Sequence, residues 1–320
     1  MSISVLGAGA FGTALAIAIS RETDVILWAR DSAHVAEMQN ARQNAKRLPD
    51  ADFPSQLFVT DDLEVACQNN VILLAVPMQK LGTFLKTHHG VLTSKTLVAC
   101  CKGVDQATGL GPIETITKHV PDAHAAILTG PSFAADIAQG LPTALTLACA
   151  DDTVGEALQK SLSTPVLRLY RTTDVTGAAL GGAFKNVIAI ACGVAMGAGL
   201  GESARAALMT RGFAEMTRLA QSRGAQSLTL AGLSGFGDLT LTCTSAQSRN
   251  YRLGLSLGAA KGFDETITVE GAATARALRD LAQTQNMDLP ITVTVAAILD
   301  KTMDVRAAMA ALLSRPLKEE

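Results

Sequence analysis

Residues 5–16 read VLGAGAFGTALA and place Gly7, Gly9 and Gly12 in the spacing G-x-G-x-x-G. The apolar residues before them are typical of a strand, and the small and apolar residues after them are typical of a helix. Gly7 permits a tight turn, Gly9 lets the backbone approach a pyrophosphate, and Gly12 permits close packing of the helix. Unpaired N–H groups at a helix start also favour phosphate oxygens. The stretch therefore predicts a dinucleotide-binding turn, with a glycine turn that binds no ligand as the alternative.

This turn begins a long alternation of short apolar segments with helical stretches. Aliphatic segments predict eight strands, at 3–6, 24–28, 57–60, 71–76, 96–101, 125–129, 144–149 and 166–170. Helical stretches separate most of them, which is typical of βαβ crossovers and a largely parallel sheet. We therefore expect residues 1–172 to form an α/β domain, a Rossmann-type doubly wound sheet that binds the dinucleotide.

The pattern changes after residue 173. Stretches rich in Ala, Leu and Gly at helical spacing cover 174–196, 203–222 and 270–283, and no strand is predicted among them. A chain of 320 residues is also longer than one hydrophobic core usually supports. Residues 173–320 are therefore expected to form an all-α C-terminal domain that carries the substrate site and the catalytic group.

The composition argues against several kinds of partner and site. The formal net charge is −2, and no segment is rich in lysine and arginine. Affinity for nucleic acid or for an anionic membrane depends on clustered positive charge, so we expect neither as the main partner. The six cysteines include no C-x-x-C pair, so we expect reduced core residues and neither a metal site nor a disulfide framework.

Two apolar segments could be mistaken for export or membrane signals. Residues 3–19 have no positive charge before Arg21 and contain regularly spaced glycines, so we expect structure in a cytoplasmic protein rather than a signal peptide. Residues 175–201 are rich in glycine and alanine and carry Lys185 as their only charge. A central lysine opposes membrane insertion, so a buried helix is favoured over a membrane span.

The residue at the end of the second predicted strand bears on the choice of cofactor. An enzyme that prefers NAD usually has Asp or Glu there, whereas this chain reads LWARD and ends the strand on Arg30. A guanidinium can bind a 2′-phosphate, so we expect NADPH or NADH as cofactor, with NADPH favoured. The alternative is that Arg30 is a solvated residue beside Asp31, the N-cap of the next helix.

Hydride transfer to a carbonyl requires a proton donor, usually His, Lys or Tyr. The five histidines lie in polar stretches of the first domain, and neither Tyr170 nor Tyr251 has a lysine one helical turn later. Lys185 remains, within GGAFKNVIAIACG at residues 181–193. Partial burial would lower its pKa toward the range useful for acid catalysis. The alternative is a lysine at the domain junction whose amine reaches solvent.

Two further segments supply polar groups. Residues 232–250, GLSGFGDLTLTCTSAQSRN, are interpreted as a long glycine-rich loop that carries Asp238, Thr242, Ser248, Arg249 and Asn250. An arginine with nearby hydroxyls and amides suits a phosphoryl group, and Asp238 could orient Lys185; ordinary surface polarity is the alternative. Lys102 follows a strand end and would face the ligand crevice of the sheet, unless it is a solvated Lys-Gly turn.

The motifs together resemble bacterial NAD(P)-dependent glycerol-3-phosphate dehydrogenases over nearly the whole chain. The matching stretches are GAGAFGTALA (7–16), LWAR (27–30), KG (102–103), GPSFA (130–134), GGAFKNVIAIACG (181–193), AALMTRG (206–212), GLSGFGDLTLTCTS (232–245), SRN (248–250) and VEG (269–271). The resemblance implies reversible reduction of dihydroxyacetone phosphate to sn-glycerol 3-phosphate, for glycerophospholipid synthesis. It also implies a C-terminal domain like that of 6-phosphogluconate dehydrogenase.

The resemblance assigns roles residue by residue. It implies that Lys185 donates or accepts the proton. From the residue spacing we expect no metal site. The substrate-binding positions are Lys102, Gly130, Ser132, Lys185, Asp238, Ser248, Arg249 and Asn250. The cofactor-binding positions are Gly7, Gly9, Ala10, Phe11, Gly12, Arg30, Lys102, Ala134, Arg249 and Glu270. The chain departs from the family at Ser203, Arg47 and Asp136, where Asn, Tyr and Glu are usual, which leaves local contacts open.

Two other functions are considered. Ketopantoate reductase and related β-hydroxyacid enzymes also combine a Rossmann domain, a helical domain and a lysine, but their substrates carry carboxylates, and the GFGDLTLTCTS and SRN stretches favour a phosphate. A dinucleotide-sensing regulator would bind NADPH without turnover, but no DNA-binding module is evident. The sequence leaves open whether the chain forms a homodimer.

Overall fold

The computed structural model describes residues 2–264 and 267–314. The chain divides into two compact units: the first holds residues 1–102 and 110–179, and the second holds 103–109 and 180–320. Residues 103–109 thus belong to the second unit although the chain on both sides of them belongs to the first. Val104, in this short segment, is buried in the hydrophobic core of the second unit.

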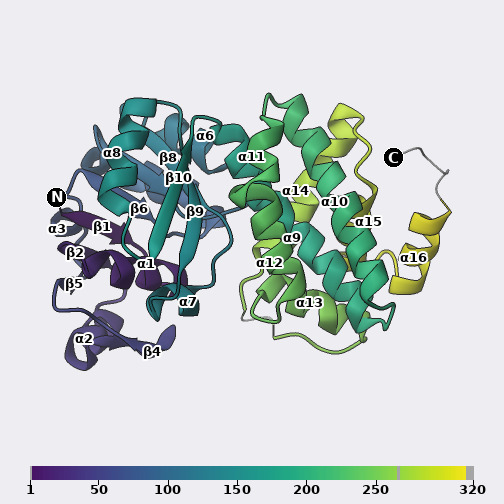
Figure 1. Cartoon of the computed structure of the whole chain (residues 1–320), viewed down its shortest axis with the longest axis horizontal. Coiled ribbons are helices and arrows are strands. Elements are labelled where there is room, and N and C mark those ends of the chain that lie inside the picture. The colour runs from purple at the N-terminus through teal and green to yellow at the C-terminus, as the bar shows by residue number, and fades with distance from the viewer. Residues whose placement is uncertain (1, 265–266, 315–320) are drawn as a thin grey trace. The chain divides into compact units, whose positions relative to one another are not determined.

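The first unit is built on an eight-stranded sheet (Figure 1), in the order β10-β9-β8-β7-β6-β1-β2-β5. The strands are β1 (Ile3–Leu6), β2 (Val25–Trp28), β5 (Leu57–Thr60), β6 (Val71–Leu74), β7 (Thr96–Ala99), β8 (His124–Thr129), β9 (Thr143–Cys149) and β10 (Leu167–Thr172). Every neighbouring pair is parallel except β8 and β9. All eight predicted strands are present, with ends displaced by at most two residues.

Helices cover both faces of this sheet because consecutive residues of a strand point to opposite sides. Val5 packs into one hydrophobic cluster and Leu6 into the other, and Leu73 and Leu74 divide in the same way. The helices of the first unit are α1 (Ala10–Ser20), α2 (Ser32–Ala41), α3 (Leu63–Ala66), α4 (Met78–Thr87), α5 (His89–Leu92), α6 (Pro112–His119), α7 (Ala134–Ala138) and α8 (Asp152–Leu162). Buried residues of α1, α2, α7 and α8 join the cluster of Val5, and those of α3, α4 and α6 join that of Leu6. The predicted doubly wound fold is confirmed.

A small hairpin accompanies the sheet and was not predicted. Strands β3 (Gln43–Asn44) and β4 (Leu48–Asp52) pair antiparallel to each other. Their residues are mostly polar and include a proline, so they lack the alternating apolar pattern by which a strand is recognised. Asn44 is nevertheless completely buried.

The second unit consists of helices joined by turns and loops, and no strand occurs in it among the residues that the structure describes. It comprises most of α9 (Val175–Gly197), and then α10 (Glu202–Ser222), α11 (Ser227–Ala231), the π-helical turn η1 (Leu233–Gly237), α12 (Asp238–Thr244), α13 (Arg249–Gly258), α14 (Glu270–Gln285), α15 (Pro290–Leu299) and α16 (Val305–Leu313). The three predicted helical stretches correspond to α9, α10 and α14, which confirms the all-α character of this part.

The prediction of a long loop over residues 232–250 is wrong. These residues form η1 and α12 and begin α13. The glycines that suggested a loop permit close packing instead: a Cβ on Gly235 would overlap the carbonyl oxygen of Leu230, and one on Gly181 would lie 2.7 Å from that of Ser234. Glycine in this segment therefore brings backbones together rather than leaving the chain open.

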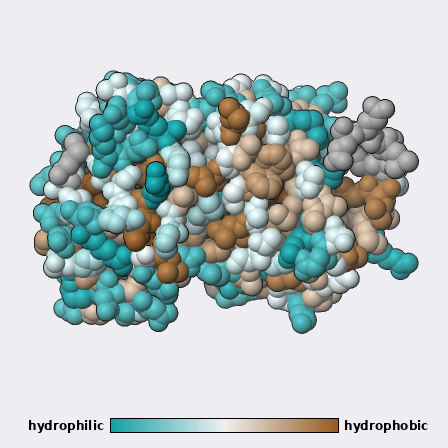
Figure 2. Space-filling model, in the orientation of Figure 1, coloured by the Kyte–Doolittle hydropathy of each residue, from teal (hydrophilic) through white to brown (hydrophobic). Residues whose placement is uncertain are grey.

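Helix α9 is long and apolar enough to cross a membrane, but 83% of its most apolar window is buried. Phe184 and Val187, on either side of Lys185 and Asn186, are completely buried in the core of the second unit. On the face of the molecule shown in Figure 2, hydrophobic residues form separate patches among hydrophilic ones. These observations agree with the predicted buried helix.

A buried carboxylate joins two helices of the second unit. Glu215 of α10 is 2% exposed and accepts hydrogen bonds from Ile291 N (2.6 Å), Thr292 N (3.2 Å) and the Thr292 hydroxyl (3.1 Å). These amides lie in the first turn of α15, whose own N-cap, Leu289, has no side chain able to cap it. Burial raises the pKa of Glu215, and the backbone hydrogen bonds act in the opposite direction.

Candidate active site

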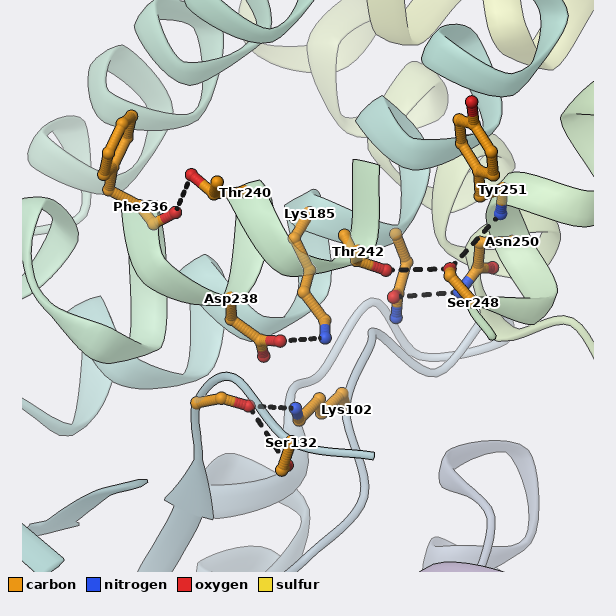
Figure 3. A network of polar contacts seen from close by, with 12 residues as sticks. Lys102, Ser132, Lys185, Phe236, Asp238, Thr240, Thr242, Ser248, Asn250 and Tyr251 are labelled. Carbon is orange, nitrogen blue, oxygen red and sulfur yellow. Dashed lines mark hydrogen bonds and ion pairs between the residues drawn. The ribbon is translucent and has the colours of Figure 1, made fainter. Parts of the chain in front are cut away.

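The central feature of the second unit is a buried ion pair between Lys185 of α9 and Asp238, the first residue of α12 (Figure 3). Lys185 is 7% exposed and Asp238 is 1% exposed. The apolar surroundings disfavour the ammonium, whereas the carboxylate favours it and holds the amine in one position. The structure thus places Lys185 and Asp238 together, as the sequence hypothesis required, and it does so in the core rather than in a solvated position.

Neutral polar groups continue from this pair (Figure 3). The hydroxyls of Thr242 and Ser248 lie 2.8 Å apart, and Ser248 caps α13. The Asn250 amide donates to the side-chain oxygen of Asn186 (2.9 Å) and accepts from Gly271 N (2.9 Å). The cluster therefore joins the starts of α13 and α14 to α9 and α12, the helices that carry the ion pair.

Asn186 was not among the predicted site residues, and Thr242 was named only as one of the polar groups of residues 232–250, with no ligand assigned to it. Asn186 directly follows Lys185 on α9, and Thr242 lies four residues after Asp238, on the same face of α12. Those spacings were the available signal. The remaining predicted residues of this unit are Arg249, exposed in the first turn of α13, and Glu270, partly buried at the start of α14.

In the first unit, the glycine turn has the geometry that its spacing predicted. Gly7 has φ +119°, and a Cβ there would lie 2.6 Å from the carbonyl oxygen of Ala75; one on Gly12 would overlap the carbonyl of Gly7. Gly9 is the N-cap of α1, without a side-chain cap, and has open space where a Cβ would be. Ala10 and Phe11 follow in the first turn of α1.

This turn lies at the reversal of strand order. After β1 the chain adds β2 and β5 on one side and then β6 on the other. Open α/β sheets bind their ligands at the carboxyl ends of the strands beside such a reversal. The helix start and the open space at Gly9 therefore suit a pyrophosphate.

Arg30 lies after β2 and is exposed. Asp31 is the N-cap of α2 and accepts from His34 N (3.2 Å), as the alternative interpretation proposed. Because Asp31 alone makes this cap, the Arg30 guanidinium is not needed for it. Both interpretations of Arg30 therefore stay open.

A second polar group of the first unit lies after β7 and β8 (Figure 3). The amine of Lys102 and the hydroxyl of Ser132 each donate to the carbonyl oxygen of Gly130, both at 3.2 Å. Ala134 begins α7, two residues after Ser132. Lys102 is partly buried and bonded to backbone, which differs from a fully solvated Lys-Gly turn. The structure thus brings together three of the predicted substrate-binding residues in this unit.

Other candidate chemistries find little support. All six cysteines are buried and free, and burial raises the pKa of Cys67 to about 11 and of Cys100 to about 12, so both stay protonated at neutral pH. Among the described residues, no group of His, Cys, Asp and Glu could hold a metal ion. Of the departures from the family pattern, Arg47 and Ser203 are exposed, and Asp136 is partly buried in α7.

Comparison with known proteins identifies close relatives. A family model for the N-terminus of NAD-dependent glycerol-3-phosphate dehydrogenase matches residues 2–155, and one for its C-terminus matches residues 174–310. The chain is 62% identical to "Glycerol-3-phosphate dehydrogenase [NAD(P)+]" of Ruegeria sp. and 58% identical to that of Roseobacter denitrificans, each over 320 residues and the full length of both proteins. A crystal structure of glycerol-3-phosphate dehydrogenase from Coxiella burnetii superposes with a TM-score of 0.92 at 36% identity, covering 98% of this chain and 99% of that one.

Proposed function

The chain belongs to the family of NAD-dependent glycerol-3-phosphate dehydrogenases, and from this premise we propose that it interconverts dihydroxyacetone phosphate and sn-glycerol 3-phosphate. It is an oxidoreductase that uses NAD(H) or NADP(H). The family resemblance inferred from the motifs is confirmed. The observation that carries the proposed chemistry is the buried ion pair of Lys185 with Asp238, beside polar groups from four helices.

The glycine turn fits a dinucleotide, because Gly7 and Gly12 pack too closely for a side chain and Gly9 has open space where a Cβ would be. When bound, the nicotinamide supplies or accepts the hydride. The residues of the first unit proposed to hold the cofactor are Gly7, Gly9, Ala10, Phe11, Gly12, Arg30, Lys102 and Ala134. Those of the second unit are Arg249 and Glu270.

In the proposed reduction, C2 of the ketone accepts the hydride and the electron pair of the C=O bond moves to oxygen. The Lys185 ammonium gives its proton to that oxygen and becomes a neutral amine, which regains a proton from solvent. Asp238 accepts the hydrogen bond of Lys185 throughout and thereby aims the amine. In the oxidation direction the neutral amine accepts the proton instead.

The phosphate of the substrate is proposed to bind Arg249, with Ser248, Asn250 and Lys102 as further donors. An arginine presents two parallel donors to phosphate oxygens, and a helix start adds N–H groups. The phosphate is remote from the reacting carbon, so its binding energy can align C2 without weakening the chemical step. Gly130 and Ser132 are proposed to complete the substrate contacts.

The test follows the loss of nicotinamide absorbance when dihydroxyacetone phosphate is added with NADPH or with NADH. We expect turnover with both cofactors and none with ketopantoate. Binding of NADPH without any loss of absorbance would instead indicate a regulator without turnover. Faster turnover of ketopantoate than of dihydroxyacetone phosphate would overturn the assignment of a phosphate-bearing substrate.

We further propose a preference for NADPH, a role in glycerophospholipid synthesis and a cytoplasmic location. The exposed guanidinium of Arg30 supports the preference. Residues 1–172 are proposed as the cofactor domain and 173–320 as the substrate domain; the observed units divide nearby, between 179 and 180, apart from residues 103–109. A homodimer stays a prediction, which light scattering of the purified enzyme tests.

A further inference from the structure

The unpredicted hairpin carries a polar side chain to the glycine turn. Asn44 of β3 is 0% exposed, and its amide nitrogen donates to the carbonyl oxygen of Ala8 (3.1 Å) and to the hydroxyl oxygen of Thr13 (2.8 Å). Ala8 lies between the first two glycines of the motif, and Thr13 lies one turn into α1. The Asn44 side chain thus bonds to the chain just before α1, at Ala8, and within α1, at Thr13.

The orientation of this amide follows from its neighbours. The carbonyl of Ala8 can only accept a hydrogen bond, so it must face the amide nitrogen of Asn44. The amide oxygen then faces His34 Nε2 at 3.0 Å and accepts from it. His34 is held in the first turn of α2, where its backbone N–H bonds to Asp31. Asn44 is therefore fixed from two elements.

This contact controls the direction of the peptide between Ala8 and Gly9. In a trans peptide the C=O and the N–H point in opposite directions. Because the Ala8 carbonyl points to Asn44, the N–H of Gly9 points the opposite way within the same peptide plane, away from Asn44. Gly9 is the N-cap of α1, and its carbonyl accepts the first helical hydrogen bond, from Thr13 N at 2.9 Å. Asn44 thereby orients an N–H at the proposed pyrophosphate site.

We propose that Asn44 is a positioning residue for the dinucleotide, acting through the peptide that it holds rather than through the ligand. The inference rests on the proposed function, because the glycine turn is taken as the cofactor site. The pyrophosphate is common to NADH and NADPH, so loss of Asn44 weakens both equally.

The experiment compares Asn44→Ala and Asn44→Asp with the wild-type enzyme. Asn44→Asp keeps the size of the side chain and the acceptor for His34 but loses both donors. Loss of one neutral hydrogen bond that orients a binding group corresponds to roughly a three- to tenfold change in Kd. We expect the Kd values of NADH and NADPH, measured by fluorescence titration, to rise together by about this factor. The KM of dihydroxyacetone phosphate and the kcat at saturating cofactor should stay within about twofold of the wild-type values, because Asn44 contacts neither the proposed substrate residues nor Lys185.

A matched control is Asn69→Ala. Asn69 donates to the hydroxyl of Ser4 on β1 (3.0 Å), so its loss removes a partly buried hydrogen bond to the strand that precedes the glycine turn, without touching the turn itself. We expect this variant to lower the thermal midpoint without changing either Kd. Equal Kd values in wild-type and Asn44 variants, with only the thermal midpoint lowered, would overturn the proposal.

Two further results keep the test decisive. If both Asn44 variants fail to fold, Asn44→Ser takes their place, because it keeps a polar side chain but lacks the amide that donates to the Ala8 carbonyl. An unchanged cofactor Kd in that variant would overturn the proposal. Binding is measured without substrate. An enzyme that binds NADPH but does not reduce dihydroxyacetone phosphate would therefore refute the proposed function. The role of Asn44 would still be decided by the cofactor Kd values of the wild type and the variants.

Discussion

Replacing Asp238 by Asn is expected to reduce both stability and turnover. Asp238 is 1% exposed and its partner Lys185 is 7% exposed, so solvent hardly screens their interaction. Breaking a buried pair by removing one charge costs about 3 to 5 kcal/mol, because the other charge is left uncompensated. The unpaired amine can avoid this cost by losing its proton. It would then no longer supply the proton for reduction, which corresponds to roughly a 10²- to 10⁴-fold loss of kcat.

Urea denaturation and pH–rate profiles measure the two effects separately. We expect the free energy of unfolding of Asp238→Asn to fall by about 3 kcal/mol or more. Its remaining reductase activity should be confined to lower pH than that of the wild type, because only acid keeps the unpaired amine protonated. The double variant Lys185→Met/Asp238→Asn should recover much of the stability and none of the activity. A single variant with wild-type stability and an unshifted pH profile would refute the role given to the ion pair.

Three other variants test separate parts of the structure. Lys185→Ala should lower kcat by about 10³-fold while the Kd of NADPH stays within about twofold; near-normal turnover would exclude its proton transfer. Arg30→Ala should raise the KM of NADPH by about 10- to 100-fold and leave that of NADH nearly unchanged, since only NADPH carries the 2′-phosphate; an unchanged ratio in steady-state assays would remove its assignment. Burial raises the pKa of Glu215 above its unfolded value, so its contribution to stability is present below about pH 4.3 and is lost as pH rises through the folded-state pKa. In urea titrations at several pH values, Glu215→Gln should therefore gain stability relative to wild type as pH rises, and parallel curves would contradict this.

The sheet was predictable because its central strands, such as β1 and β6, are buried on both sides. Segments such as Val71–Leu74 are continuously aliphatic and follow polar residues, here Asn69 and Asn70, so the strand stands out in the sequence. The hairpin of β3 and β4 lacks that pattern, because only Leu48 and Ala51 of it enter the hydrophobic core and its other buried residue is the polar Asn44. Residues 232–250 were wrongly predicted to be a loop, because a segment rich in glycine looks the same in the sequence whether its glycines form a loop or permit close helix packing.

The site was predictable in part. A lone charge within an apolar helix is unusual, which singled out Lys185 from the sequence. Asp238 lies 53 residues later, and only the fold determines that the two meet. Asn186 and Thr242 are neutral, and such residues are as common in structural hydrogen bonds as in binding sites. Their place in the cluster followed from the positions of the helices.

The segment of residues 103–109, which places Val104 in the core of the second unit, limits how the polypeptide can be divided. A fragment that begins at residue 180 would lack this valine, and the vacancy would cost about 1.5 to 3 kcal/mol of lost burial. A fragment that ends at residue 179 would expose the same side chain to water. We therefore expect each fragment to be less stable by itself than the same residues in the intact chain. Two co-expressed pieces should assemble best when the chain is cut outside residues 103–109 and outside α9, which contains the division at 179–180.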